Sequence, residues 1–562
     1  MSRRNLLKAG ALGGAAVALP LERIAHTKGG VDRMRTSRMP KPFSLPFTVP
    51  PVAVPTHNED VRCFDGVGRS YACYDLTQMF SVAEIMPGYK TPFFGYNGIL
   101  AGPTIVAHHG QPIVVNQTNA LHLPPPAPNQ NARVPSPYTN NPFQRWTSTH
   151  LHGSASLPQY DGYASDITMP GQRKRYFYPN CQEARTIWYH DHGVHHTAQN
   201  AYNGLAAMYI LHDPEELALG IPQGRYDIPI VLRDAMFDSK GGLVYEDNSE
   251  SGVYGDVILI NGVPWPEMRV ERRKYRFRFL NASVSRSYRW LLHDGRDPVP
   301  MTMIATDAGL MPRPQQITSF KIGMAERYEV VIDFAEYSDN TLLTFRNLSP
   351  DNNIDYDTTE YGMRFRVVGD ATSTENNEIP EDWEARRPAP ECMTWNEADL
   401  KAQQVPDRRF EFIRTNGHWT INGETWEDVV NSGYTHCAAE PAQDSIEIWE
   451  LANKSGGWFH PVHIHLVDFQ VLSRNGSASR VFDYEKGPKD VVYVGENETV
   501  RVAMRFAGPA AGEGWPTPKG RYMMHCHNLV HEDHDMMVQF SVGDPEHDPL
   551  VDPIAGEKPV WL

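Results

Sequence analysis

The chain has 562 residues, which is too long for one hydrophobic core and predicts two to four domains. Hydrophobic residues make up 41% and charged residues 21% of the sequence, as in an ordinary globular protein. The net charge is −16, from 52 basic and 68 acidic residues, which argues against nucleic acid or an anionic membrane as a partner.

The first residues have the pattern of an export signal. Arg3 and Arg4 precede an apolar run from Leu6 to Leu19 that is too short to cross a bilayer. The start MSRRNLLK is similar to bacterial twin-arginine signals. We therefore expect residues 1–26 to be a signal peptide and the protein to be periplasmic or extracellular, with no segment in the membrane.

Short strand-like runs follow, separated by turns rich in proline (45 residues) and glycine (43 residues). This pattern predicts an all-β protein of three β-sandwich or barrel domains in series. We expect the domains at residues 45–213, 222–370 and 405–545, with a charged, Pro-rich linker at 371–404. In the second domain, RYDIPIVL, KYRFRFL and AERYEVVIDF alternate polar and apolar residues as half-buried strands do. The Pro-rich stretch after Leu121 predicts a long surface loop.

Histidine pairs of the form His-x-His occur four times, where chance predicts about one. Residues i and i+2 of a strand face the same side, so each pair can present two imidazoles to one metal site. Eight imidazoles suit a cluster of borderline metals such as copper, because a single zinc ion takes only four ligands. The pairs are His150/His152, His190/His192, His463/His465 and His525/His527.

Strand alternation separates a second ligand set from these pairs. Cys526 lies between His525 and His527 and must face the opposite side of its strand. His460 lies an odd number of residues before His463 and should also face away from the cluster. Two histidines, a thiolate and a distant methionine sulfur are the ligands of a blue-copper electron-transfer site. The remaining residues that match this set are His460, Cys526, His531 and Met536.

Disulfide pairing cannot be assigned from the six cysteines, which are Cys63, Cys73, Cys181, Cys392, Cys437 and Cys526. If Cys526 binds a metal, the other five form at most two disulfides and leave at least one free thiol.

The motifs HLHG, WYHDHG, HPVHIHLVDF and HCHNLVHEDHDMM, in this order, resemble those of the multicopper oxidases, the laccase-like group. The similarity covers most of residues 60–545, and the most similar branch is the bilirubin oxidases, in segments such as DGYASDI, INGVPWP, MAERYEVVIDF and KDVVYVG. The resemblance implies three cupredoxin domains, with a trinuclear copper cluster between the first and third. It also implies four copper ions per chain, which are one type 1, one type 2 and two type 3.

The resemblance assigns a role to each matching residue of this sequence. The type 1 copper would be held by His460, Cys526, His531 and Met536, and the type 2 copper by His150 and His463. The type 3 pair would be held by the remaining histidines of the four pairs, which are His152, His190, His192, His465, His525 and His527.

Three further residues match functional positions of the family. Glu532 and Asp161 match acidic residues that relay protons, and the alternative for each is an ordinary hydrogen-bonding carboxylate. Trp458 matches a tryptophan that bilirubin oxidases keep at the substrate surface, linked covalently to the type 1 histidine; the alternative is a core indole. Asp191 and Asp468 are candidate partners for the outward imidazole nitrogens.

The function that the resemblance implies is one-electron oxidation of an aromatic reductant, coupled to reduction of dioxygen to water. The reductant would be bilirubin or another tetrapyrrole, a phenol or an aminophenol, and the protein is expected to be a monomer. One alternative is a metallo-oxidase of Cu(I) or Fe(II) in metal homeostasis. The second domain and the region before residue 400 have no clustered methionine-rich insert, which disfavours Cu(I) collection. A non-enzymatic alternative is a copper-free cupredoxin scaffold of the cell envelope.

Overall fold

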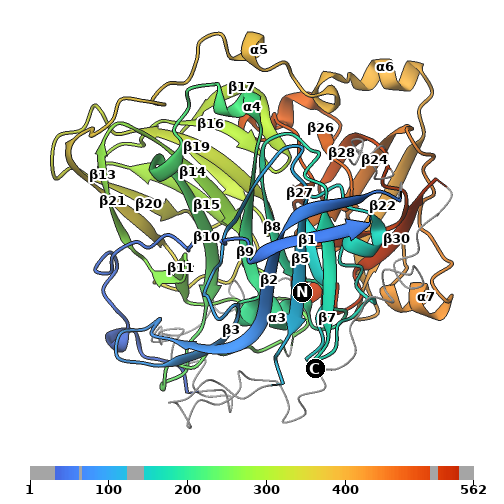
Figure 1. Cartoon of the computed structure of the whole chain (residues 1–562), viewed down its shortest axis with the longest axis horizontal. Coiled ribbons are helices and arrows are strands. Elements are labelled where there is room, and N and C mark those ends of the chain that lie inside the picture. The colour runs from blue at the N-terminus through green and yellow to red at the C-terminus, as the bar shows by residue number, and fades with distance from the viewer. Residues whose placement is uncertain (1–31, 63–65, 123–144, 248, 507–516, 544–562) are drawn as a thin grey trace, which may run out of the picture.

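A computed structural model describes residues 32–62, 66–122, 145–247, 249–506 and 517–543 (Figure 1). The predicted signal peptide, Cys63 and nearly all of the Pro-rich stretch after Leu121 lie outside these residues. In the described ranges the strands form six sheets, two in each of three successive units. None of the helices in these ranges has the length and apolar character that crossing a bilayer requires.

The first unit pairs a sheet of order β1-β2-β5-β7, with β3 beside β2, with a sheet of order β4-β9-β8-β6. Apolar residues of both sheets share one buried cluster, as in a β-sandwich. The helices α3 (Thr197–Asn203) and α4 (Pro214–Leu217) flank β9 in the chain. The strands are β1 (His57–Arg62), β2 (Gly68–Ala83), β3 (Thr91–Tyr96), β4 (Ile105–His108), β5 (Ile113–Asn119), β6 (Thr149–His152), β7 (Arg173–Tyr178), β8 (Arg185–Asp191) and β9 (Ala206–His212).

The second unit combines a sheet of order β12-β11-β10-β14-β19-β16-β17 with a sheet of order β13-β21-β20-β15-β18. It forms the green and yellow side of the molecule in Figure 1. Its strands are β10 (Asp227–Ala235), β11 (Val257–Ile260), β12 (Val263–Pro264), β13 (Glu267–Arg272), β14 (Lys274–Asn281), β15 (Tyr288–His293), β16 (Met301–Thr306), β17 (Gly309–Ile317), β18 (Ser319–Ile322), β19 (Arg327–Asp333), β20 (Leu342–Asn347) and β21 (Tyr361–Asp370).

The prediction that strands β10, β14 and β19 are half-buried is wrong, because the polar side chains of these strands are buried as well. Arg276 and Arg278 of β14 are at most 1% exposed. The Arg278 guanidinium donates to Asp227 at 2.7 Å and to Glu329 at 2.8 Å, and also to the Thr186 hydroxyl of the first unit. The polar alternation therefore marks a buried ion-pair network at a contact between units.

The third unit contains a sheet of order β23-β22-β24-β28-β26 and a sheet of order β27-β25-β29-β30. It forms the orange and red side of Figure 1 and includes the helices α7 (Trp426–Asn431) and α8 (Leu529–Asp533). Its strands are β22 (Asp407–Thr415), β23 (His418–Ile421), β24 (Ile446–Asn453), β25 (His460–Ile464), β26 (Phe469–Arg474), β27 (Val491–Val494), β28 (Thr499–Arg505), β29 (Gly520–Cys526) and β30 (Met537–Val542). The predicted limits of the three domains remain predictions.

The segment between the second and third units is packed against the protein rather than loose. It contains α5 (Trp383–Arg386) and α6 (Glu397–Ala402). The Trp383 side chain is buried, and its indole N–H donates to the Met311 carbonyl at 2.9 Å. Anchoring of this kind connects the segment to β17 while the chain passes to the third unit.

Candidate metal centres

The eight paired histidines come from two strand pairs, one in the first unit and one in the third. His150 of β6 is paired with His190 of β8, and His463 of β25 is paired with His525 of β29. Directly paired residues present their side chains to the same face of a sheet. The second histidine of each sequence pair lies two residues further along the chain. His152 is still within its strand, whereas His192, His465 and His527 lie just after the ends of β8, β25 and β29.

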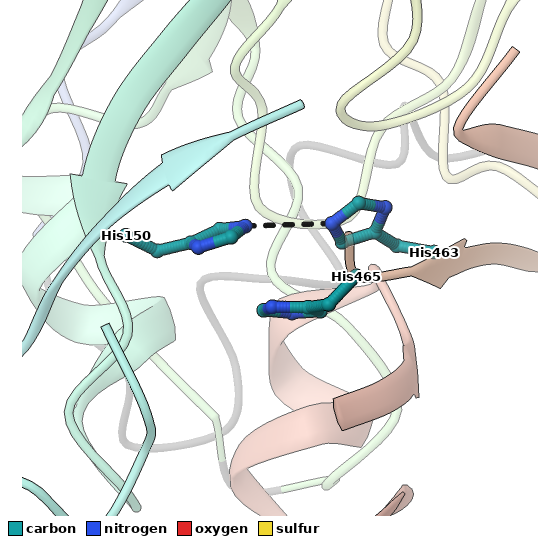
Figure 2. A group of neighbouring side chains, drawn as sticks. All are labelled: His150, His463 and His465. Atoms are coloured by element: carbon teal, nitrogen blue, oxygen red, sulfur yellow. Dashed lines mark hydrogen bonds between the residues drawn. The ribbon is translucent and has the colours of Figure 1, made fainter. Parts of the chain in front are cut away.

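The two strand pairs meet where His150 faces His463. Their Nε2 atoms are 3.4 Å apart, and the ring of His465 stacks on that of His150 with centroids 4.1 Å apart. Figure 2 shows His150 reaching in from the first unit, and His463 and His465 from the third. The histidine cluster is therefore built from both units.

The other histidines form two groups of three. The His525 Nε2 atom lies 3.2 Å from the Nε2 atoms of both His192 and His465. The rings of His152, His190 and His527 have centroids 5.1 to 5.8 Å apart. With His150 and His463, these groups account for all eight histidines, and contacts also cross between them, since His152 stacks on His463 with ring centroids 3.7 Å apart.

Most of these rings use one nitrogen for a protein partner and leave the other facing the cluster. The Nδ1 atoms of His463 and His190 each donate to a backbone carbonyl at 2.8 Å, on Asp490 and Asp191 respectively. The His190 Nε2 atom, the His152 Nδ1 atom and both nitrogens of His527 are buried without a hydrogen-bond partner. Buried polar atoms are rarely left without a partner, so these orphaned nitrogens fit a metal cluster.

Burial favours the neutral, metal-binding form of His190 and His192. It lowers the pKa of His190 to about 3 and the pKa of His192 to about 4. Neutral imidazole is a ligand of copper, and eight of them exceed what a single tetrahedral ion can use. The donor set therefore fits several copper ions.

The two predicted acids both contact cluster histidines. Glu532 in α8 lies 2.8 Å from the His525 Nδ1 atom and 3.4 Å from the His192 Nδ1 atom. Burial alone would raise its pKa, but His525 and His192 lower it to about 2. Asp161 accepts a hydrogen bond from His465 Nδ1 at 2.7 Å, and burial raises its pKa well above the usual value.

Asp490 and Arg327 are residues that the sequence analysis missed. The Asp490 Oδ1 atom lies 3.2 Å from His152 Nε2 and accepts a hydrogen bond from Arg327 Nη1 at 2.7 Å. Arg327 is fully buried in β19, so the second unit reaches the cluster through this ion pair. Nothing in the spacing of these residues signals the contact, although Asp490 lies in the KDVVYVG segment.

Asp191 and Asp468, the two other residues predicted to bond the outward imidazole nitrogens, differ in their contacts. Asp191 supports His190 through its backbone carbonyl, while its carboxylate accepts from the Ser148 N–H at 2.8 Å. The prediction for Asp468 is wrong, because its carboxylate pairs with Arg185 at 2.8 and 2.9 Å and bonds no imidazole. Asp468 therefore belongs to a charge pair near the cluster.

Cys526 lies in a second centre on the opposite face of β29. Its sulfur is 3.2 Å from His460 Nδ1 and 3.6 Å from His531 Nδ1, and all three residues are fully buried. Met536 is also fully buried, and its carbonyl accepts the Cys526 backbone N–H at 3.1 Å. A thiol with two imidazoles, beside a buried methionine, fits one copper ion of the blue type.

The outer nitrogens of this second centre also have partners. His460 Nε2 lies 2.8 Å from the Ser455 hydroxyl, and His531 Nε2 lies 3.3 Å from the Ser251 carbonyl. Each ring therefore directs its Nδ1 atom toward the sulfur. Such contacts fix the orientation of metal-binding imidazoles.

Two tryptophans stand beside the Cys526 centre. Trp419, which the sequence analysis missed, stacks on the His531 ring with centroids 3.7 Å apart and an interplanar angle of 24°. Trp458 is half-buried, and its ring meets His531 and Trp419 edge-on at 5.9 and 5.6 Å. The predicted Trp458 is thus near the centre, in contact with His531.

Comparisons with known proteins identify the family of the chain. Models with the description multicopper oxidase match residues 128–216, 227–362 and 402–546. A model of the twin-arginine translocation pathway signal sequence matches residues 1–20, which indicates export and confirms the predicted signal.

Individual relatives cover most of the chain. A bilirubin oxidase of Albifimbria verrucaria is 40% identical over 516 residues, which cover 89% of this chain and 81% of that protein. A laccase of Bacillus subtilis (strain 168) is 31% identical and covers 81% of this chain and 91% of the laccase.

Solved structures share the fold. The 2F4 variant of the McoA multicopper oxidase from Aquifex aeolicus aligns with a TM-score of 0.73 at 27% identity, covering 89% of this chain and 99% of that one. A laccase from Pediococcus acidilactici aligns with a TM-score of 0.72 at 26% identity, covering 92% and 97%. The predicted all-β fold of three cupredoxin-like domains is confirmed. The chain belongs to the multicopper oxidase family, whose members are copper-dependent oxidoreductases that use dioxygen as the electron acceptor.

Proposed function

We propose that the two centres hold four copper ions and couple the oxidation of an aromatic reductant to the four-electron reduction of dioxygen to water. The segment His525-Cys526-His527 carries the proposal. Its thiol enters one centre, while the flanking imidazoles enter the other. Electrons taken up beside Cys526 would therefore have a path of a few covalent bonds to the histidine cluster.

The grouping of the side chains suggests which residues hold each ion. His460, Cys526, His531 and Met536 would hold the type 1 copper, and the facing pair His150 and His463 the type 2 copper. Each group of three histidines would hold one type 3 copper. One group is His152, His190 and His527, and the other is His192, His465 and His525.

Bound copper would supply one-electron redox chemistry at both centres. The protein supplies a dry, preformed arrangement of ligands. Every imidazole of the two centres is at most 1% exposed, and hydrogen bonds on the outer nitrogens fix most rings. Rigid, buried ligands need little rearrangement when the charge of the site changes, which favours rapid electron transfer.

Glu532 and Asp161 are placed to handle the protons that dioxygen reduction consumes. Each acid contacts an imidazole on the side away from the cluster. The pKa of Glu532 is lowered by His525 and His192, whereas burial raises the pKa of Asp161. Two carboxyl groups that contact different imidazoles of one cluster suit proton relay.

The aromatic surroundings of the Cys526 centre favour an aromatic reductant. Trp419 is fully buried against His531, whereas Trp458, which meets the same ring edge-on, is only half-buried and leaves part of its indole open to solvent. Planar rings such as those of a phenol, an aminophenol or a tetrapyrrole can stack on such a surface. The name of the relative that is 40% identical, bilirubin oxidase, is in line with this class. All proposed ligands come from one chain, so a monomer suffices.

Two measurements test the proposal. Metal analysis of the copper-loaded protein should give four copper ions per chain, and the oxidised protein should absorb strongly at roughly 600 nm. Turnover of bilirubin, a substituted phenol, Fe(II) and Cu(I) should then be compared under the same conditions. Faster turnover of the metal ions than of every aromatic compound would favour a metallo-oxidase instead. A colourless protein with no oxidase activity would favour a scaffold.

A further inference from the structure

The sheet β1-β2-β5-β7 of the first unit carries a separate group of metal-binding side chains. His57 of β1 is paired with Cys73 of β2, and Asp75 of β2 is paired with Asn116 of β5. Directly paired residues, and residues two apart on a strand, share one face of the sheet. Glu59 therefore lies on this face beside His57, and the register alone brings two carboxylates, an imidazole and a thiol together.

The distances in this group match those of a metal site. Cys73 Sγ lies 3.3 Å from Glu59 Oε2, and His57 Nε2 lies 3.8 Å from the same oxygen. On the other side of the ring, His57 Nδ1 lies 3.5 Å from Asp75 Oδ2. Ligand atoms about 2.0 to 2.3 Å from a tetrahedral zinc ion are themselves about 3.3 to 3.8 Å apart.

Asn116 draws three of these side chains together through its amide nitrogen. This residue is 1% exposed, and its amide nitrogen donates to Glu59, Cys73 and Asp75 at 3.3, 3.0 and 3.0 Å. Its Oδ1 atom is buried and has no hydrogen-bond partner. A cation among the acceptors would make the opposite orientation of the amide favourable, with the oxygen toward the ion.

Two arginines keep the carboxylates charged without covering them. Arg175 pairs with Glu59 Oε1, and Arg173 lies 3.3 Å from Asp75 Oδ1. Glu59 Oε2 lies toward His57 and Cys73, and Asp75 Oδ2 lies toward His57 while also accepting a hydrogen bond from the Thr56 hydroxyl at 2.8 Å. The His57 and Asp75 side chains are each 45% exposed, whereas Cys73 is fully buried. An ion can therefore enter from solvent and reach the thiol.

We propose that His57, Cys73 and Asp75 bind one borderline divalent cation, with zinc as the best match, at a site separate from the copper centres. One imidazole gives an ion one nitrogen, so His57 would use Nδ1 together with Asp75, and Glu59 would stay beside the ion as a charge partner. Thiolate and imidazole select zinc over magnesium or calcium, which prefer oxygen ligands only. Three protein ligands from two adjacent strands would fasten the edge strand β1 to β2. The proposal does not depend on the oxidase function.

The test uses the full, copper-loaded protein incubated with zinc sulfate, desalted and analysed for both metals. One zinc ion per chain should be retained while the copper content and the visible spectrum stay unchanged. His57→Gln and Cys73→Ser should each weaken zinc binding by at least about tenfold, a loss that even residues orienting a ligand can cause. Cys437→Ser, which changes a thiol in the third unit, should bind zinc as the parent does.

The His57→Gln variant is decisive if Cys73→Ser does not fold, because His57 is exposed and can be replaced without disturbing the core. Its intact visible spectrum would show that the variant is folded. Three results would overturn the proposal: no zinc retained by the parent, equal zinc in the parent and His57→Gln, or zinc gained only as copper is lost.

Discussion

Cys526 and His525 are consecutive residues whose side chains enter different centres. The Cys526 sulfur lies 3.2 Å from His460 Nδ1, whereas His525 Nε2 lies 3.2 Å from His192 Nε2. Strand β29 ends at Cys526, and the chain continues directly to His527. The two centres are therefore connected by the backbone of three consecutive residues. Separating their chemistry by mutation is therefore a direct test of the proposed function.

Replacing Cys526 by serine should remove the blue centre alone. A hydroxyl is a poor copper ligand compared with a thiolate, so the absorption at roughly 600 nm should disappear. Metal analysis should find three copper ions per chain, because the eight histidines are unchanged. Cys437→Ser is the matched control and should keep the colour. A blue Cys526→Ser protein would contradict the assignment of the thiol.

Replacing Glu532 by glutamine should slow dioxygen reduction and leave the blue colour intact. The glutamine keeps the shape and a hydrogen bond to His525 but cannot hold a proton. General acid–base groups contribute about 10²- to 10⁴-fold, so a decrease in turnover of about a hundredfold is expected. Stopped-flow reoxidation of the fully reduced enzyme by dioxygen measures this step. Unchanged reoxidation would show that Glu532 only orients His525 and His192.

The parts of the site that can be predicted from the sequence are those that depend on residues close together in the chain. Strand alternation predicts that His525 and Cys526 lie on opposite faces, and this prediction needs only two adjacent residues. The contact of Asp490 with Arg327 and the stacking of Trp419 on His531 join residues more than 100 positions apart. No spacing marks such contacts. Likewise, the alternation in β14 indicates a polar face, but only the tertiary structure shows that Arg276 and Arg278 are buried there by another unit.

Replacing Arg327 by glutamine should weaken the histidine cluster and spare the blue centre. Without the guanidinium, the buried Asp490 loses its charge partner and no longer has a fixed orientation beside His152. Loss of a residue that orients a metal ligand typically costs about 10- to 100-fold in metal affinity. Titration with a copper chelator should therefore remove the cluster ions at lower chelator concentrations, while the absorption at roughly 600 nm persists.

Arg474→Gln is the control for this effect. Arg474 is also buried and pairs with Glu485 at 2.5 Å in the third unit. Its loss should destabilise the fold, since breaking a buried pair leaves an uncompensated charge. Copper retention by the cluster should not change. Equal copper loss in both variants would mean that Arg327 acts through general stability and does not position His152.

His534, which follows α8, should make stability depend on pH near neutrality. Its Nε2 atom lies 2.9 Å from Asp247 Oδ2, and this hydrogen bond raises the pKa of His534, with a smaller opposing effect of burial. Glu250 and Asp535 add to the increase. A histidine whose folded pKa is raised stabilises the protein fully below its unfolded pKa of about 6.5. That contribution is lost as the pH rises through the folded pKa.

The melting temperatures of the parent and His534→Gln should therefore differ most below about pH 6.5 and converge at higher pH. The measurement is a series of thermal melts of both copper-loaded proteins in buffers of constant ionic strength. A difference between parent and His534→Gln that stays constant, or grows as the pH rises, would show that Asp247 does not stabilise the imidazolium form.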